Sequence, residues 1–400
     1  MVPLDGFRFE YRPPIIRYGS GCVAELASEL AAAGCERALV VCGTTVGETD
    51  AVIAPIQDGL GGRFVGLFAE TTPEKRLGTA YRLSDRIEKR NVDVVIAVGG
   101  GSSLDIAKIA TVLTATDQSR TTVGDTFETS RTVTVPNRPL LPVIAVPTTL
   151  AGADISQGAG ITASPDSGLV GTETGGGVSH PKLMPHAVFA DPRLVATTPR
   201  DVLAASAMNG FDKGIEGLYA ANATAITDGT AVWGLSLLSD ALVEFGKGDE
   251  SEHRYEELLC GLLCVQYGLS RPDGSSLSLI HSFGHALARN TPLQQGTAHG
   301  VIAPHALSLL FSHVEGRREL LAEALGVAHT NDPAAAVIER VTEIRDALGL
   351  PARLRDLPGP DQDAFQSVAA DVLADPLMRQ APNGFDPTPE EIETVLLNAW

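Results

Sequence analysis

The stretch MNGFDKGIEGLYA at 208–220 places a lysine among residues that could do chemistry. Lys213 lies one helical turn after Asn209, with Asp212 and Glu216 beside it on the expected helix. A compact ammonium could polarise a substrate carbonyl or steady an alkoxide, and desolvation could lower its pKa until it donates a proton. The alternative is a solvated surface lysine, ion-paired within its own helix.

Two histidines one turn apart, His281 and His285 in HSFGH, form a second group of candidates, and His299 follows in AHG. Imidazole serves as an acid, a base or a metal ligand near neutral pH. The alternative for these positions is a buried core histidine with its hydrogen bonds satisfied. Arg289 and Lys213 could together hold a substrate carboxylate, an expectation that rests on residue type alone.

The segment VVIAVGGGSSLDIAK joins an apolar strand to a helix through three glycines and two serines. The glycines let the backbone approach a phosphate closely, and Ser102 or Ser103 can cap a helix whose positive end faces the anion. The spacing matches neither the dinucleotide fingerprint nor a P-loop, and a tight turn without ligand is the alternative. A second loop, VIAVPTTLAGADIS, adds threonine hydroxyls at the carboxyl edge of the same sheet. The predicted nucleotide contacts are Gly43, Gly99, Gly100, Gly101, Ser102, Ser103, Asp105, Thr148 and Thr149.

Short apolar runs alternate with helical patterns in the first half of the chain, at 38–43, 64–68, 92–101 and 141–149. Continuous Val, Ile and Ala runs predict strands buried on both faces of a parallel sheet. Helix-compatible stretches then follow at 202–222, 228–246, 254–270 and 275–289. We predict an α/β nucleotide-binding domain with a parallel sheet at 1–194, followed by an all-α substrate and catalytic domain at 195–400.

The composition limits the class of partner. A chain of 400 residues usually holds more than one hydrophobic core. Its 49 acidic and 30 basic residues give a formal net charge of −19, which argues against nucleic acid or an anionic membrane as partner. Only six of the basic residues are lysines, a composition typical of halophilic surfaces.

The five cysteines are scattered, which favours reduced thiols and a cytoplasmic protein over a disulfide framework. Cys260 and Cys264, four residues apart, are expected to pack in a core rather than bind a metal. We expect neither a signal peptide nor a membrane span.

Several motifs together resemble the iron-containing alcohol dehydrogenase family, part of the dehydroquinate synthase-like superfamily. They are GGGSSLDIAK at 99–108, PTTLAG at 147–152, ADPRL at 190–194, the helix at 208–220, HSFGH at 281–285 and AHG at 298–300. The resemblance implies a nucleotide-binding domain, a helical domain, and a cleft where a nicotinamide meets an alcohol or carbonyl. It favours site roles for His281 and His285, and it implies a homodimer.

The resemblance also identifies two departures. In metal-using members, an Asp and a His four residues apart join two later histidines around iron or zinc. The matching positions here are Asn209 and Lys213, with His281 and His299 as the later pair. A neutral amide and a cation should weaken such a site severely, so no metal is expected and the two histidines are weak metal candidates. His299 follows His285 at a longer interval than in the family. We predict Lys213, His281, His285 and Asn209 as catalytic residues.

The motifs resemble the maleylacetate reductase branch more closely than the other branches. Members of that branch do not depend on the metal as their relatives do, and they carry Asn at the position of Asn209 but generally a His where Lys213 stands. The prediction is an NAD(P)-dependent, metal-independent reductase of a small carbonyl or keto acid. NADP is not excluded, since Cys42-Gly43-Thr44 occupies the place where NAD-selective relatives often present an Asp.

Three alternatives remain: a metal-dependent alcohol dehydrogenase, a lyase like dehydroquinate synthase that keeps NAD and a metal, and a nucleotide-binding protein without catalysis. The substituted ligand positions disfavour the first two. His281, His285 and the glycine-rich phosphate-binding segment at 99–103 disfavour a protein without catalysis.

Overall fold

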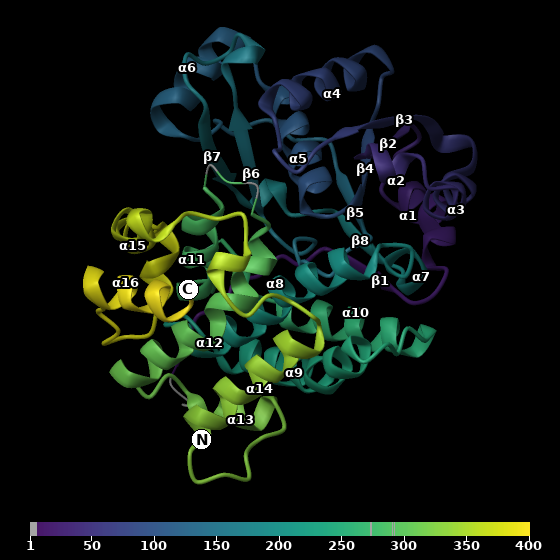
Figure 1. Ribbon diagram of the computed structural model, residues 1–400. Coiled ribbons are helices and arrows are strands. Elements are labelled where there is room, and N and C mark those ends of the chain that lie inside the picture. Colours follow the sequence, from purple (N-terminus) through teal and green to yellow (C-terminus); the bar gives the residue numbers. More distant parts are fainter. Residues whose placement is uncertain (1–5, 273, 290, 292) are drawn as a thin grey trace. The chain divides into compact units, whose positions relative to one another are not determined.

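The computed structural model describes residues 6–272, 274–289, 291 and 293–400. The chain forms two compact units, which we describe one at a time (Figure 1). The α/β unit comprises Arg12–Thr148 and Ala153–Thr197. The helical unit comprises Thr198–Trp400, the short segment Thr149–Gly152 and the N-terminal residues through Tyr11. The sequence pattern predicts the boundary between the two units at 194–195. It does not indicate that Thr149–Gly152 and the residues before Arg12 belong with the helices.

A six-stranded sheet forms the centre of the α/β unit, in the order β1-β8-β5-β4-β2-β3 with every pair parallel. The predicted α/β class with a parallel sheet is confirmed. The inner strands β2, β4 and β5 are buried almost throughout because helices cover both faces. The strands are β1 (Ile15–Tyr18), β2 (Ala38–Gly43), β3 (Phe64–Thr71), β4 (Val94–Gly99), β5 (Val143–Pro147) and β8 (Ala187–Ala190).

Seven helices accompany this sheet in the described chain. Side chains of β2, β4, β5 and β8 pack with the apolar faces of the first and third helices in one core that includes Val40, Ile96, Val146, Phe189 and Ile56. The helices are α1 (Leu26–Ala32), α2 (Thr44–Gly47), α3 (Asp50–Leu60), α4 (Leu77–Lys89), α5 (Gly101–Ala115), α6 (Arg120–Ser130) and α7 (Pro192–Val195).

The sequence analysis misses four strands of this unit. The antiparallel pair β6 (Gly158–Ala163) and β7 (Thr174–Ser179) reads GAGITA and TGGGVS, which lacks the branched apolar runs that identify the parallel strands. Strands β1 and β8 have only four residues each. Strand β8 pairs with both β1 and β5, and this pairing, rather than local propensity, defines the two strands.

Two charged side chains of helix α5 fix it to strand β6. The Lys108 ammonium, only 1% exposed, donates to the carbonyls of Ser156 and Gly158 at 2.6 and 3.0 Å. Asp105 accepts the Gly160 N–H at 3.1 Å. Because burial disfavours the charged form, it lowers the pKa of Lys108 from 10.5 to about 8.

The second unit is built mainly of helices, as predicted. They are α8 (Arg200–Tyr219), α9 (Ala225–Gly246), α10 (Glu252–Gln266), α11 (Leu279–Ala288), α12 (Gln295–His313), α13 (Arg318–Ala324), α14 (Pro333–Ala347), α15 (Phe365–Ala374) and α16 (Pro389–Asn398). The expectation of an all-α domain needs one correction. A two-residue antiparallel ladder joins β9 (Ser270–Arg271) to β10 (Gly274–Ser275), because the turn between α10 and α11 folds back on itself.

Arg317 holds three helices of this unit together. Its guanidinium donates to both carboxylate oxygens of Asp228 in the first turn of α9, at 2.8 and 2.6 Å. It also donates to the Leu218 carbonyl in the last turn of α8, at 2.7 Å. A bidentate pair of this kind fixes orientation as well as distance.

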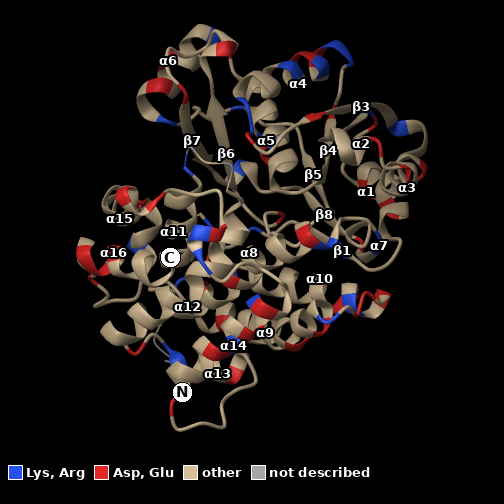
Figure 2. Ribbon diagram, viewed as in Figure 1, with Lys and Arg blue, Asp and Glu red and all other residues tan. Residues whose placement is uncertain are grey.

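Acidic residues are frequent on three helices of the second unit. Figure 2 marks them in red along α13, α14 and α16, where Glu319, Glu323, Glu339, Glu343, Glu390 and Glu393 lie. No helix in the described ranges is both long and apolar enough to cross a bilayer.

The lowered pKa of Lys108 gives a prediction about stability and pH. Because the folded-state pKa lies below the unfolded value, the buried charge destabilises the fold below about pH 8, and this cost disappears as the pH rises toward 10.5. We expect the free energy of unfolding of the wild type, relative to Lys108→Met, to rise by about 1–2 kcal/mol between roughly pH 7.5 and pH 9.5. Urea unfolding of both proteins measures it. A difference independent of pH would contradict the assignment.

Candidate active site

Three loops carrying predicted nucleotide contacts end adjacent strands of the α/β unit. Gly43 ends β2, Gly99 ends β4, and Thr148 follows β5. The Thr148 N–H donates to the Gly99 carbonyl at 3.2 Å, which ties two of the loops together. The chain runs from β2 outward to β3 and then returns to β4 on the other side of β2. Such a switch point at the carboxyl ends of strands is where open α/β sheets bind ligands.

The start of helix α5 suits a phosphate. Gly99 has a φ of 128°, a conformation that side chains disfavour. The N-cap residue Gly100 gives the helix no side-chain cap, and of the first turn the Ser103 N–H donates to the Gly100 carbonyl at 3.2 Å, so the N–H groups before it can serve an outside acceptor. Ser103 is buried and bonds Thr71 at 2.8 Å, while Ser102 is half-buried. The residues present therefore fit a bound pyrophosphate.

Asp105 has an internal partner in the same unit. Its carboxylate forms an ion pair with Lys75 at 2.6 Å in addition to its bond with strand β6. The structure thus gives Asp105 a role in holding α5 in place, and contact with a nucleotide stays a prediction for this residue. Thr149 is half-buried and belongs to the helical unit, unlike its neighbour Thr148.

The helical unit gathers most of the predicted catalytic residues around helix α8. Glu216 of α8, fully buried, faces His281 of α11, and its Oε2 lies 2.5 Å from the ring Nδ1. Its Oε1 accepts the N–H groups of Ile280 and His281 at 2.7 and 3.2 Å and the Tyr219 hydroxyl at 3.2 Å. Burial raises the pKa of Glu216, against the charge of His299 and these backbone donors. Glu216 therefore fixes the His281 ring and is not a solvated partner for Lys213.

The other nitrogen of His281 faces Asn209. Nε2 lies 3.2 Å from the amide Oδ1. Burial lowers the pKa of His281 well below 6.5, and the charges of His299 and Lys213 act in the same direction. The charge of Asp375 acts in the opposite direction. The structure thus brings Asn209 and His281 into contact, and the charge of Lys213 acts on the same ring. Catalytic roles for these residues stay a prediction.

His299 of α12 packs edge-on against His281, with ring centroids 4.5 Å apart. Its Nδ1 lies 3.3 Å from Asp212 Oδ2, an ion-pair distance. The angles are not those of a hydrogen bond, and within the described chain both ring nitrogens and both Asp212 oxygens lack one. We therefore treat the contact as proximity. Burial lowers the pKa of His299 to about 3 and raises that of Asp212 well above 3.8, so burial disfavours the charged form of both groups.

His285 and Arg289 have partners on other segments of the helical unit. His285 is 45% exposed and its Nδ1 lies 2.9 Å from Asp375. Burial raises the pKa of Asp375, but the hydrogen bond and charge of His285 outweigh it, and the net pKa is lowered. Arg289 pairs with Asp371 at 2.7 Å. Neither contact includes a hydrogen bond to His281, although the charges of His285 and Asp375 act on the pKa of His281.

The donor groups in the cluster around His281 do not fit a divalent metal. The Nε2 of His281 faces an amide oxygen, and that of His299 lies against the Gly284 backbone, where an added Cβ would be 2.2 Å away. Lys213 adds a cation at the remaining position. Among the described residues, no three His, Cys, Asp or Glu side chains are grouped as metal ligands. This donor set would bind iron or zinc weakly.

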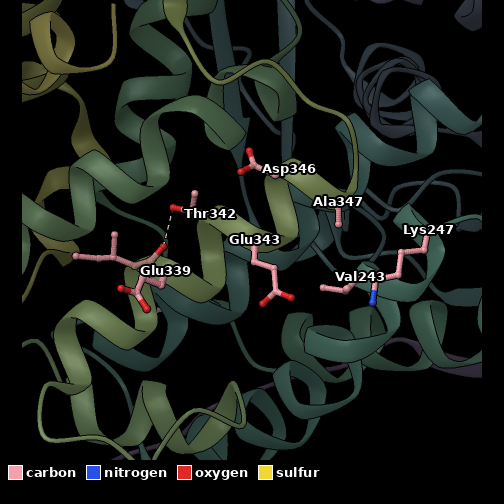
Figure 3. Close-up of a pocket in the computed structure, with 8 residues that line it drawn as sticks. Val243, Lys247, Glu339, Thr342, Glu343, Asp346 and Ala347 are labelled. Atoms are coloured by element: carbon pink, nitrogen blue, oxygen red, sulfur yellow. Dashed lines mark hydrogen bonds between the residues drawn. The ribbon is translucent and has the colours of Figure 1, made fainter.

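Two other features lie outside this cluster. A groove of about 570 Å³ lies between α9 and α14. Figure 3 shows its lining, which includes Val243 on α9, Lys247 directly after it, and Glu339, Glu343 and Asp346 on α14. Its lining includes none of the predicted catalytic residues. Cys260 and Cys264 are free thiols, each partly exposed rather than in the core.

The sequence analysis did not assign site roles to Glu216, Asp212 or Asp375. The first two were considered only as surface partners of Lys213. Their spacing carries a usable signal, because Asp212 and Glu216 lie one turn apart and so share one face of α8. Nothing local in the sequence links Asp375 to His285, ninety positions earlier.

Comparison with known proteins identifies one family that matches both halves of the chain. A family model described as iron-containing alcohol dehydrogenase matches residues 13–192, and the model of that family's C-terminal part matches 203–400. A maleylacetate reductase from Pseudomonas aeruginosa is 28% identical, covering 89% of this chain and 88% of its own. An NAD-dependent methanol dehydrogenase from Bacillus methanolicus is 25% identical, covering 97% and 98%. The structure of sulfoacetaldehyde reductase from Bifidobacterium kashiwanohense with NAD⁺ shares the fold, with a TM-score of 0.82, 19% identity and coverage of 98% and 99%.

The close contact of Gly284 with His299 gives a prediction about packing. Replacing glycine by alanine inside a helix ordinarily stabilises by about 0.5–1 kcal/mol. In Gly284→Ala the new methyl group must displace the buried ring, and overpacking costs about 1–3 kcal/mol. We expect a net loss of about 1–2 kcal/mol in the free energy of unfolding.

The matched control is Gly229→Ala in α9, where a Cβ would meet no atom within 4 Å. It should gain roughly 0.5–1 kcal/mol. Equal effects of the two substitutions in thermal unfolding would show that Gly284 is not in close contact with His299.

Proposed function

Because this chain belongs to the iron-containing alcohol dehydrogenase family and is an oxidoreductase, we propose that it reduces a small carbonyl compound with NADH or NADPH, without a divalent metal. The observation that carries the proposal is the set of groups around His281. Where metal-using relatives place an acidic ligand and a histidine, this chain places the amide of Asn209 and the ammonium of Lys213. These groups suit a substrate oxygen better than a cation.

The nucleotide would bind at the start of helix α5 in the α/β unit. The first turn of α5 and the glycines before it can accept a pyrophosphate through backbone N–H groups. The similar methanol dehydrogenase is named NAD-dependent, and the sulfoacetaldehyde reductase structure contains NAD⁺. A reduced nicotinamide, when bound, supplies the hydride.

The residues of the helical unit would act on the substrate oxygen. Negative charge develops on this oxygen as the carbonyl carbon receives the hydride, and the ammonium of Lys213 would stabilise that charge. His281 and Asn209 would complete the polar contacts, and His285 would lie at the edge of the site with Asp375. The similarity to maleylacetate reductases favours a keto acid as substrate.

Other expectations also stay proposals. A homodimer and a halophilic source rest on resemblance and composition, and a cytoplasmic location rests on the thiols, all five of which are free.

A substrate screen tests the proposal directly. NADH and NADPH oxidation with a panel of keto acids and aldehydes, in high salt, should reveal turnover that EDTA leaves unchanged. The purified protein should hold well under one equivalent of iron or zinc, since its donor set is poor for both. A full equivalent of metal that EDTA removes together with activity would overturn metal independence.

The role of Lys213 is tested by Lys213→Ala. Removing one preorganised group that stabilises an oxyanion costs roughly 10²-fold or more in kcat. We expect kcat and kcat/KM to fall together by that factor, with unchanged nucleotide affinity in calorimetry. The control is Lys247→Ala, which removes a surface lysine paired with Glu244 and should keep full turnover. Near-normal turnover of Lys213→Ala would show that the lysine is not catalytic.

A further inference from the structure

We propose that Glu216 is the positioning residue that enables His281 to protonate the substrate oxygen, an inference that rests on the proposed reduction. The His281 ring contacts Glu216 through Nδ1 on one side and Asn209 through Nε2 on the other.

The geometry places two protons on this pair. Nε2 lies 3.2 Å from the Asn209 amide oxygen; with that oxygen facing the ring, the amide can only accept, and we therefore assign a hydrogen to Nε2. Nδ1 and the Glu216 Oε2 lie 2.5 Å apart, and two lone pairs would repel at that distance. A second proton therefore lies between them, shared by the carboxylate and the ring.

This arrangement lets the ring give up a proton without becoming an anion. When the Nε2 proton passes to the substrate oxygen, the shared proton stays on Nδ1, and the ring is left as a neutral imidazole beside the Glu216 carboxylate. The hydride adds to the carbonyl carbon and the Nε2 proton to its oxygen, which yields the alcohol. The pair then recovers one proton from solvent.

An amide at position 216 would prevent this transfer. Three donors, from Ile280, His281 and Tyr219, converge on the Oε1 of Glu216. In Glu216→Gln the amide oxygen must occupy that place, which turns the NH₂ group toward Nδ1. The NH₂ group donates a hydrogen bond to Nδ1 but cannot transfer its proton to the ring. Loss of the Nε2 proton would then leave the His281 ring as an imidazolate anion.

The expected kinetic result follows from the size of general acid catalysis. Glu216→Gln should fold, bind NADH or NADPH as the wild type does, and lose about 10²-fold or more in kcat. The matched control is Asp228→Asn, a second exchange of a buried carboxylate for an amide in the same unit, at the Arg317 clamp. It should lose stability but keep turnover.

The spectroscopic result does not require activity. In protein labelled with ¹⁵N-histidine, the shared proton should give a strongly downfield ¹H signal coupled to one imidazole nitrogen, assigned by its loss in His281→Asn. The signal should persist in Asp228→Asn and be absent in Glu216→Gln. If Glu216→Gln does not fold, Glu216→Asp, whose carboxylate is withdrawn by one methylene, should lose the signal and lower kcat.

The outcomes separate the two proposals. No such signal in the wild type, its survival in Glu216→Gln, or a kcat of Glu216→Gln within about threefold of the wild type would overturn the role of Glu216. A wild type that shows the signal but oxidises neither NADH nor NADPH with any carbonyl would overturn the proposed reduction, while the hydrogen-bonded pair would stand.

Discussion

The buried carboxylate of Glu216 is the interaction on which the helical unit's site depends. Its Oε1 accepts two N–H groups from the first turn of α11, where the N-cap residue Ser278 makes no side-chain cap. Its Oε2 contacts the imidazole ring of His281, which is one of these two residues. One side chain of α8 thus caps α11 and orients its histidine, and losing it would leave buried donors unpaired.

Burial then determines how charge is distributed around this carboxylate. His281, His299, Asp212 and Glu216 are all 3% exposed or less, in a chain whose formal charge is −19. Desolvation lowers the pKa of both imidazoles, whereas Lys213 is only half-buried. In the proposed reduction the two groups would be complementary around the substrate oxygen, because the ring of His281 would transfer a proton and the ammonium of Lys213 would stabilise negative charge.

The parallel sheet could be predicted because its inner strands are buried on both faces and therefore consist of continuous Val, Ile and Ala runs. The glycine-rich strands β6 and β7 could not, since glycine has weak strand propensity and their pairing comes from contact with each other. Strands β1 and β8 could not be predicted either, because each has only four residues and is defined by its pairing with neighbouring strands. The ladder of β9 and β10 likewise depends on a turn that a helical pattern does not reveal.

By itself, the sequence determined which groups could meet a substrate: a strand, three glycines and a helix for phosphate, and Asn209 and Lys213 one turn apart on α8. Those facts are local, since helical periodicity and strand-to-helix turns involve neighbouring residues. Only the tertiary structure decided that Glu216 binds His281, that Asp212 approaches His299, and that His285 pairs with Asp375. These contacts join residues 65 to 90 positions apart, and their energies depend on burial, which no local pattern specifies.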